Sequence, residues 1–236
     1  MTGSGVPRPT TAIGGAHITT IALASANCYL LPAASGFVMV DTGLPSRRAD
    51  IDTALAKAGC VPGRLQLIVL THGDYDHAGN AAHLRERFGA KLAMHRDDVG
   101  RVERGDWNWG LKAKPDRFSA LFRIAALFIK PGPFDTFQPD LYLEDGQSLD
   151  DYGSDARVLH LPGHTPGSIG ILTSGRDLFC GDLLANFFFR PGLEFFINDL
   201  TAARASVERL RGLGVRMVYP GHGRPFPMER LPRGRA

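Results

Sequence analysis

The apolar run LQLIVL at residues 65–70 constrains the fold more than any other segment of the chain. The run has the length of a strand, and a run of this kind is expected for a strand buried on both faces. It ends at THGDYDHAGN (71–80), and a helix is predicted from about residue 78 to 88, closed by Gly89. KLAMH (91–95) is the next predicted strand. Strands that alternate with helices predict an α/β architecture.

The same alternation continues through most of the 236 residues. Before the central run, strands are predicted at 17–23, 27–31 and 36–40, and a helix at 46–58 with Ser46 as its N-cap and Gly59 at its C-cap. After it, strands are predicted at 157–161, 168–174, 177–182 and 215–220, with a helix at 201–211. We expect a flexible leader (1–15), a single domain (16–228) and a basic tail (229–236).

Residues 96–140 fit this alternation poorly and are predicted to be a helical insertion. Apolar side chains between Phe118 and Ile129 fall on one helical face, which indicates either a helix packed on the core or a lid or dimer contact. The aromatic segment FFFRPGLEFF (187–196) leaves a similar choice between core and pocket wall.

Composition excludes several classes of function. The formal charge is only +3, and the basic residues are scattered, so no nucleic-acid partner is expected. No apolar span is long enough for a membrane helix. Cys28, Cys60 and Cys180 have no regular spacing, which indicates a reducing cytoplasm and no disulfide framework. The expected partner is a small-molecule substrate, and a homodimer is left open.

Seven polar side chains follow predicted strands or lie in glycine-rich turns, where a rigid sheet can present them together. They are His72, Asp74, Asp76, His77, His164, Asp182 and His222. Imidazole and carboxylate ligands suit zinc, iron or manganese, and the absence of cysteine ligands disfavours a closed structural zinc site. Two ions could share a water molecule, with an aspartate bridging them. The remaining histidines lie inside predicted strands or helices and not in such loops, so they are interpreted as ordinary: His17, His83, His95 and His160.

Five motifs in order, VDTG (40–43), THGDYDHAGN (71–80), PGHTPGS (162–168), GD (181–182) and PGHG (220–223), resemble the metallo-β-lactamase superfamily. The resemblance covers about residues 17–226. It implies a four-layer αβ/βα sandwich, with two mixed central sheets flanked by helices and two metal ions at one edge. It also implies that Asp41 is structural, and it implies two ligand sets: His72, position 74, His164 and Asp182 for the first ion, and Asp76, His77, Asp182 and His222 for the second.

Asp74 departs from the family pattern His-x-His-x-Asp-His, because it stands where the second histidine belongs. One interpretation is that the ligand role is lost and the first site is weak or empty. The other is a carboxylate ligand, whose extra negative charge would make the ions weaker Lewis acids and raise the pKa of bound water. Zinc is the expected metal, with manganese or iron as alternatives because of Asp74.

The resemblance is strongest to the glyoxalase II and lactonase branch, which implies a hydrolase. We expect a hydroxide held by two ions to cleave an ester, thioester or lactone, with Asp76 and Asp182 as catalytic residues. Asp182 disfavours a true β-lactamase, and because the chain ends soon after His222 a glutathione thioester is not expected. The alternatives are an iron-dependent redox enzyme or dioxygenase, a phosphodiesterase, and a non-catalytic binding protein.

Overall fold

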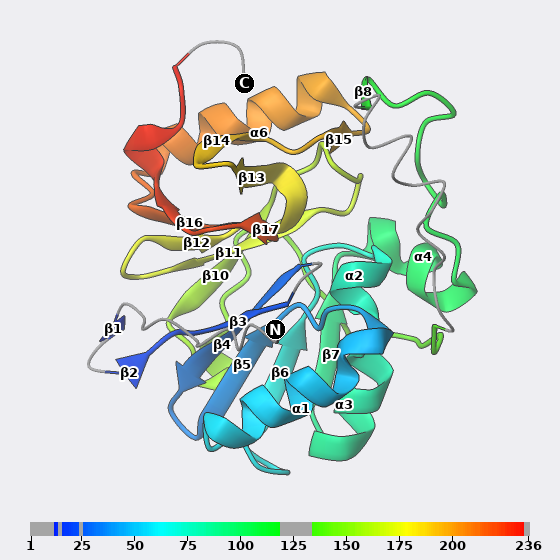
Figure 1. Ribbon diagram of the computed structural model, residues 1–236, viewed down its shortest axis with the longest axis vertical. Helices are drawn as coiled ribbons and strands as arrows, with labels where there is room; N and C mark the ends of the chain where they lie inside the picture. Colours follow the sequence, from blue (N-terminus) through cyan, green and yellow to red (C-terminus); the bar gives the residue numbers. More distant parts are fainter. Residues whose placement is uncertain (1–11, 14–15, 24–25, 119–133, 234–236) are drawn as a thin grey trace, which may run out of the picture.

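A computed structural model describes residues 12–13, 16–23, 26–118 and 134–233. Two sheets lie face to face (Figure 1). The first sheet joins an antiparallel β3–β4–β5 portion to a parallel β5–β6–β7–β9 portion, so it is mixed. Its strands are β3 (Thr19–Ala22), β4 (Asn27–Ala33), β5 (Gly36–Val40), β6 (Leu65–Val69), β7 (Lys91–Met94) and β9 (Leu141–Tyr142).

The second sheet is also mixed, because only β12 and β16 pair in parallel within it. Its order is β10 (Ala156–His160), β11 (Ile169–Thr173), β12 (Asp177–Phe179), β16 (Met217–Tyr219) and β18 (Phe226–Pro227). A smaller sheet joins β14 (Arg190–Leu193), β13 (Leu184–Phe187) and β17 (His222–Gly223). Two short pairs are β1 (Ala12–Ile13) with β2 (Ala16–His17), and β8 (Arg117–Phe118) with β15 (Phe196–Ile197).

Helices cover the outer face of each large sheet (Figure 1). The helices α1 (Arg48–Lys57) and α3 (Ala81–Phe88) pack on the first sheet, and α6 (Leu200–Gly212) packs on the second. The short helices α2 (Tyr75–Ala78) and α4 (Val99–Arg104) lie near the sheet edge. Single 3₁₀ turns are η1 (Pro45–Arg47), η2 (Arg96–Asp98), η3 (Asp150–Tyr152), η4 (Gly181–Leu183) and η5 (Met228–Arg230). The predicted four-layer αβ/βα sandwich is therefore confirmed.

Strand β6 shows why an apolar run was diagnostic. Leu67 and Val69 pack between the two sheets with Phe179 of β12, whereas Ile68 packs beneath the helices. Successive side chains of a strand point to opposite faces, so both faces of β6 are buried in different layers of the core. All of these side chains are fully excluded from solvent.

Several predicted boundaries are wrong, for local reasons. Helix α1 begins at Arg48 after η1, and its N-cap is Arg47 and not Ser46. The predicted helix 78–88 begins only at Ala81, as α3. It is separated from α2, which ends at Ala78, by Asn80, whose side-chain amide donates to the carbonyls of Thr42 (2.8 Å) and Leu44 (2.7 Å). The predicted strand 177–182 ends at residue 179, where the chain turns into η4.

The segment predicted as a helical insertion is helical only at its start within the described residues. Residues 96–104 form η2 and α4, and turns and β8 follow. The helical face predicted between Phe118 and Ile129 falls almost entirely on residues 119–133, outside the described residues. None of the described helices has the length and apolar character needed to cross a membrane.

Candidate metal centre

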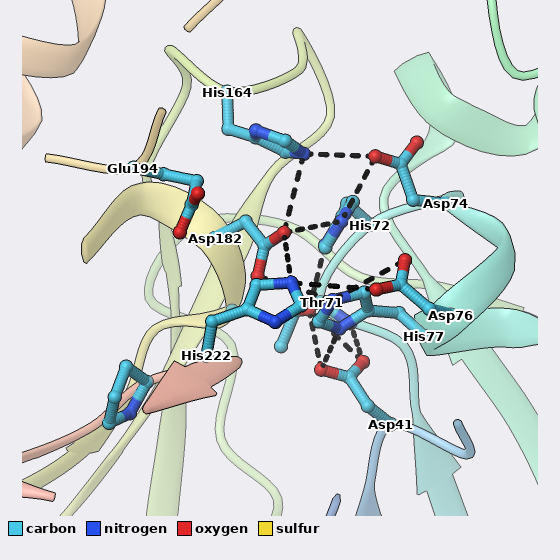
Figure 2. Close-up of polar contacts among 12 residues, drawn as sticks. Asp41, Thr71, His72, Asp74, Asp76, His77, His164, Asp182, Glu194 and His222 are labelled. Atoms are coloured by element: carbon cyan, nitrogen blue, oxygen red, sulfur yellow. Dashed lines mark hydrogen bonds and ion pairs between the residues drawn. The ribbon is translucent and has the colours of Figure 1, made fainter. Parts of the chain in front are cut away.

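All seven side chains predicted from the sequence come together at one edge of the two sheets (Figure 2). His72 follows β6, and Asp74, Asp76 and His77 belong to the start of α2. The second half of the chain supplies His164 from the β10–β11 loop, Asp182 from η4 and His222 from β17. Residues far apart in sequence therefore meet because the ends of several strands lie at the same edge.

Asp182 lies at the middle of the cluster and approaches all four histidines. Its Oδ2 atom is 3.1 Å from Nε2 of His222, 3.8 Å from Nε2 of His164 and 3.9 Å from Nε2 of His72. Its Oδ1 atom is 3.2 Å from Nε2 of His77. Burial raises the pKa of the Asp182 carboxyl, but the neighbouring His222 and His77 outweigh it and hold this pKa well below its usual value.

Two subsets offer ligand atoms that lie within 4.8 Å of one another. Group one is His72, His164 and Asp182, and group two is Asp76, His77 and His222. Three ligand atoms here, Nε2 of His72, Nε2 of His77 and Oδ1 of Asp182, are buried and have no hydrogen-bond partner among the described residues. Buried polar atoms are rarely left unpaired, so these atoms fit a site for divalent ions.

Three of the imidazole rings are oriented by hydrogen bonds at the nitrogen that faces away from the cluster. The Nδ1 atom of His77 is 2.9 Å from Oδ2 of Asp41, and that of His164 is 2.9 Å from the carbonyl oxygen of Phe196. The Nδ1 atom of His72 is 3.0 Å from Oγ1 of Thr71. Such partners fix the ring orientation of metal-binding histidines and leave Nε2 directed into the site.

The buried carboxylate of Asp41 supports the centre without facing it, as the resemblance implies. It accepts hydrogen bonds from the backbone N–H of Thr71 (2.8 Å) and from its hydroxyl (2.8 Å), and it pairs with His77. Burial lowers the pKa of His77, but the carboxylates of Asp182, Asp41 and Asp76 raise it well above its usual value. Metal binding must therefore displace protons from this cluster.

Close packing explains the glycine in PGHG. A Cβ atom on Gly221 would lie 2.2 Å from Oδ1 of Asp182 and 2.6 Å from Cε1 of His77. The preceding carbonyl, of Pro220, accepts from the Tyr29 hydroxyl (2.7 Å) and from the Asn27 amide (3.0 Å), both in β4. The loop that carries His222 is thus fastened to the first sheet.

Asp98, which no sequence pattern indicated, supports two loops of the cluster. Its fully buried carboxylate accepts from the backbone N–H of Gly73 (2.9 Å), the hydroxyl of Thr165 (2.7 Å) and the backbone N–H of Gly167 (2.8 Å). It therefore joins the loop carrying His72 to the loop carrying His164. No pattern around RDDVGR distinguishes Asp98 from the exposed Asp97 beside it.

Asp74 lies beside group one and is paired with a second missed residue, Arg101 of α4. Its Oδ1 atom pairs with the Arg101 guanidinium, and its Oδ2 atom is 3.0 Å from Nε2 of His164 and 3.5 Å from Nε2 of His72. Burial raises the pKa of the Asp74 carboxyl, but Arg101 and the two histidines hold it well below its usual value. The extra negative charge expected from Asp74 is therefore offset by a buried cation. The glycine at position 73 was the one sign of this contact in the sequence, because a larger residue there would collide with the Arg101 side chain.

Glu194 of the aromatic segment is the third missed residue, and Figure 2 shows its carboxyl group beside Asp182. Its Oε1 atom accepts from the backbone N–H of Phe195 (2.8 Å), and its buried Oε2 atom has no partner among the described residues. Burial and the charge of Asp182 raise the pKa of Glu194 to about 7. A lone acidic residue within FFFRPGLEFF was the available signal.

The rest of the aromatic segment divides between residues that pack beside His222 and an exposed tip. Phe187 stacks on Phe195 with 4.5 Å between ring centroids, and its ring centroid is 6.1 Å from that of His222. Phe188 and Phe189 form the β13–β14 turn and are 88% and 61% exposed, so neither belongs to the core. For these two residues the core alternative is therefore wrong, and the pocket-wall alternative stays a prediction for the segment.

Two of the histidines interpreted as ordinary lie close together. His95 and His160 stack with 4.2 Å between ring centroids and 7° between ring planes, next to Asp97. Nearly parallel rings direct their nitrogen lone pairs along parallel planes and not toward a common point. His160 also donates from Nε2 to the carbonyl of Pro166 (2.8 Å), so we keep the ordinary interpretation.

Comparisons with known proteins agree with this geometry. A curated relative, hydroxyacylglutathione hydrolase GloC from Haemophilus influenzae, is 34% identical over 123 residues, which is 51% of this chain and 50% of that protein. The human acyl-coenzyme A thioesterase MBLAC2 is 28% identical over 229 residues, covering 87% of this chain and 76% of its own. The solved structure of TTHA1623 in a di-iron-bound form is 27% identical with a TM-score of 0.63, covering 90% of this chain and 95% of that one.

The sequence also matches the family described as the metallo-beta-lactamase superfamily over residues 22–222, which includes every side chain of the cluster. This range includes both large sheets except β18 and most of β3, together with the helices that cover them. The chain belongs to the metallo-beta-lactamase superfamily and is a metal-binding hydrolase of that fold.

Proposed function

We propose that this chain hydrolyses an ester, thioester or lactone with two divalent ions held by the seven clustered side chains. The proposal rests on the buried ligand atoms of His72, His77 and Asp182, which converge from both halves of the fold and have no hydrogen-bond partner among the described residues. When bound, two such ions would lower the pKa of a shared water molecule and polarise a substrate carbonyl.

The side chains would have distinct roles in this reaction. Group one, with Oδ2 of Asp74, would hold the first ion, and group two the second. Asp182 approaches histidines of both groups, so it would bridge the two ions and fix their spacing. Asp76 is only partly buried, which leaves it able to orient a water molecule. Asp76 and Asp182 are thus the proposed catalytic carboxylates.

The substrate class rests on chemistry and on the relatives. Two of them carry the names of a hydroxyacylglutathione hydrolase and an acyl-coenzyme A thioesterase. Acyl transfer to water needs carbonyl polarisation and an activated water molecule, and the proposed centre could supply both without a serine or cysteine nucleophile. A small-molecule substrate is the proposed partner. The three free cysteines are buried, which supports a reducing compartment such as the cytoplasm.

The test begins with metal quantification on protein purified without added metal, followed by a panel of lactones, esters and thioesters with that metal. Bis-p-nitrophenyl phosphate serves as the phosphodiester arm. His77→Ala should lose an ion and turnover, whereas His83→Ala, a control in α3 that pairs with Asp52, should keep both. Wild-type turnover in His77→Ala would refute the assignment, and activity confined to the phosphodiester would replace the substrate class.

One alternative is supported by specific observations. Asp74 places a third carboxylate beside the histidines, and carboxylates favour harder metals than imidazole does. One similar solved structure, that of TTHA1623, was determined in a di-iron-bound form. Iron in the purified protein, together with oxygen consumption and no ester hydrolysis, would favour an iron-dependent redox enzyme. Zinc as the bound metal, with ester hydrolysis, supports the proposal.

A further inference from the structure

The ion pair between Asp74 and Arg101 is held in place by contacts with neighbouring segments. Arg101 is only 2% exposed, and a second guanidinium nitrogen, Nη1, donates to the carbonyl of Trp109 (3.3 Å). A Cβ atom on Gly73 would lie 2.8 Å from Cβ of Arg101, so the motif glycine makes room for this side chain. The pair is therefore held from α4, from the loop at Trp109 and from the loop at Gly73.

The two carboxylate oxygen atoms of Asp74 have different partners. Oδ1 is taken by Arg101, and Oδ2 alone faces His164 and His72 of group one. A carboxylate in place of an imidazole adds one negative charge, and a guanidinium in direct contact with it adds one positive charge. At such short range these two charges largely cancel as seen by a nearby ion.

We propose that Asp74 and Arg101 act together as a charge-neutral replacement for one histidine, with Arg101 as a positioning residue that presents Oδ2 of Asp74 to the first ion. This inference rests on the metal centre of the proposed function. It explains how a carboxylate can occupy the histidine position without adding net negative charge to group one. It also means that Asp74 can be replaced by histidine without loss of the first ion only if Arg101 is replaced at the same time.

The reciprocal exchange tests the proposal. Asp74→His alone leaves Arg101 as a buried cation without its partner beside a dication, so affinity for the first ion should fall by about 10- to 100-fold. Adding Arg101→Met to that variant removes the unbalanced charge and should restore two ions per chain at wild-type affinity. Such a rescue is a coupling between neighbouring residues that independent roles would not produce.

The measurements are metal content by elemental analysis and zinc affinity by calorimetry, both made without a substrate. Arg104→Met is the matched control, because Arg104 lies in the same helix and is exposed, stacking on Trp109 at 4.1 Å from the ring centroid. It should keep two ions in either background. Circular dichroism and unfolding in a chelator verify the fold, and Arg101→Gln, which keeps a donor for the Trp109 carbonyl, replaces Arg101→Met where that variant does not fold.

The outcomes separate the proposal from a merely structural ion pair. If Asp74→His binds two ions as tightly as the wild type, or if removing Arg101 fails to restore the lost ion, the neutral pair is refuted and Arg101 only fastens α4. If the wild-type protein itself binds no divalent ion, the proposed function fails first. Loss of one ion in Asp74→His and its return in the double variant supports the proposal.

Discussion

Groups one and two lie side by side but have different surroundings. His72 and His164 of group one have side chains only 1% and 3% exposed, and the nearby α4 segment supplies Asp98 and Arg101. His222 and Asp76 of group two are 17% and 28% exposed, and Phe187 of the aromatic segment lies beside His222. Both groups therefore have buried polar support, because Asp41 holds His77 of group two, but group two is the more open to solvent at His222 and Asp76.

Removal of the side chain that both groups share should produce the largest effect. Asp182→Ala deletes the carboxylate that approaches all four histidines, so we expect fewer than one bound ion per chain and a loss of turnover of at least about a thousandfold. Elemental analysis and ester hydrolysis measure the two effects. Asp151→Ala, at an exposed carboxylate in η3, is the control. Retention of two ions by Asp182→Ala would show that the groups are independent.

Removing the Asp98 carboxylate that supports group one should lower the stability of the fold. Asp98→Ala leaves the buried N–H groups of Gly73 and Gly167 and the Thr165 hydroxyl without their acceptor, so unfolding free energy should fall by about 3 kcal/mol. Urea unfolding measures this loss, and metal content should fall first at group one. The neighbouring Asp97→Ala, at an exposed position, serves as the control and should change little. Equal stability of the two variants would remove Asp98 from its supporting role.

The sequence predicts the candidate metal ligands on each loop but not the residues that support these ligands. His72 follows a strand whose apolar pattern is unambiguous, and the glycines next to His164 and His222 mark turns that need close approach. These signals are local, because a strand end and a tight turn depend on a few neighbouring residues. The fold class and the cluster therefore followed from short segments.

Arg101, Asp98 and Glu194 were missed because their roles depend on tertiary contacts. Asp98 is fully buried while its neighbour Asp97 is exposed, and only the packing of the 165–168 loop against η2 makes the difference. The break between α2 and α3 has a similar origin, since the Asn80 side chain bonds to a loop over 30 residues away. Tertiary contacts overrode local propensity at these positions.

Glu194, which lies beside Asp182, predicts a pH-dependent effect of intermediate size. Its pKa is about 7 in the folded protein, above the ordinary value of 4.5, so its contribution to stability is fully present below pH 4.5 and is lost as pH rises through 7. Glu194→Gln cannot ionise, so relative to the wild type the metal-free variant should gain about 2 kcal/mol between pH 5 and pH 8. Urea unfolding at both pH values measures this. Glu208→Gln, at an exposed position on α6, should show no such gain, and a pH-independent difference for Glu194→Gln would contradict the prediction.

The smallest expected effect concerns the aromatic segment, which lies beside His222 of group two. If its rings contact an apolar part of the substrate, as the sequence suggested, the contact should involve Phe187, which stacks on Phe195 beside His222, and not the exposed tip residue Phe188. Phe187→Ala should therefore lower kcat/KM for aryl esters by about fivefold, equivalent to roughly 1 kcal/mol, with less effect on acetate esters. Phe188→Ala should change neither, and metal content should stay at two ions in both variants. Equal effects on aryl and acetate esters would mean that Phe187 supports the position of His222 instead of selecting the substrate, and the aromatic segment would then belong to the support of group two.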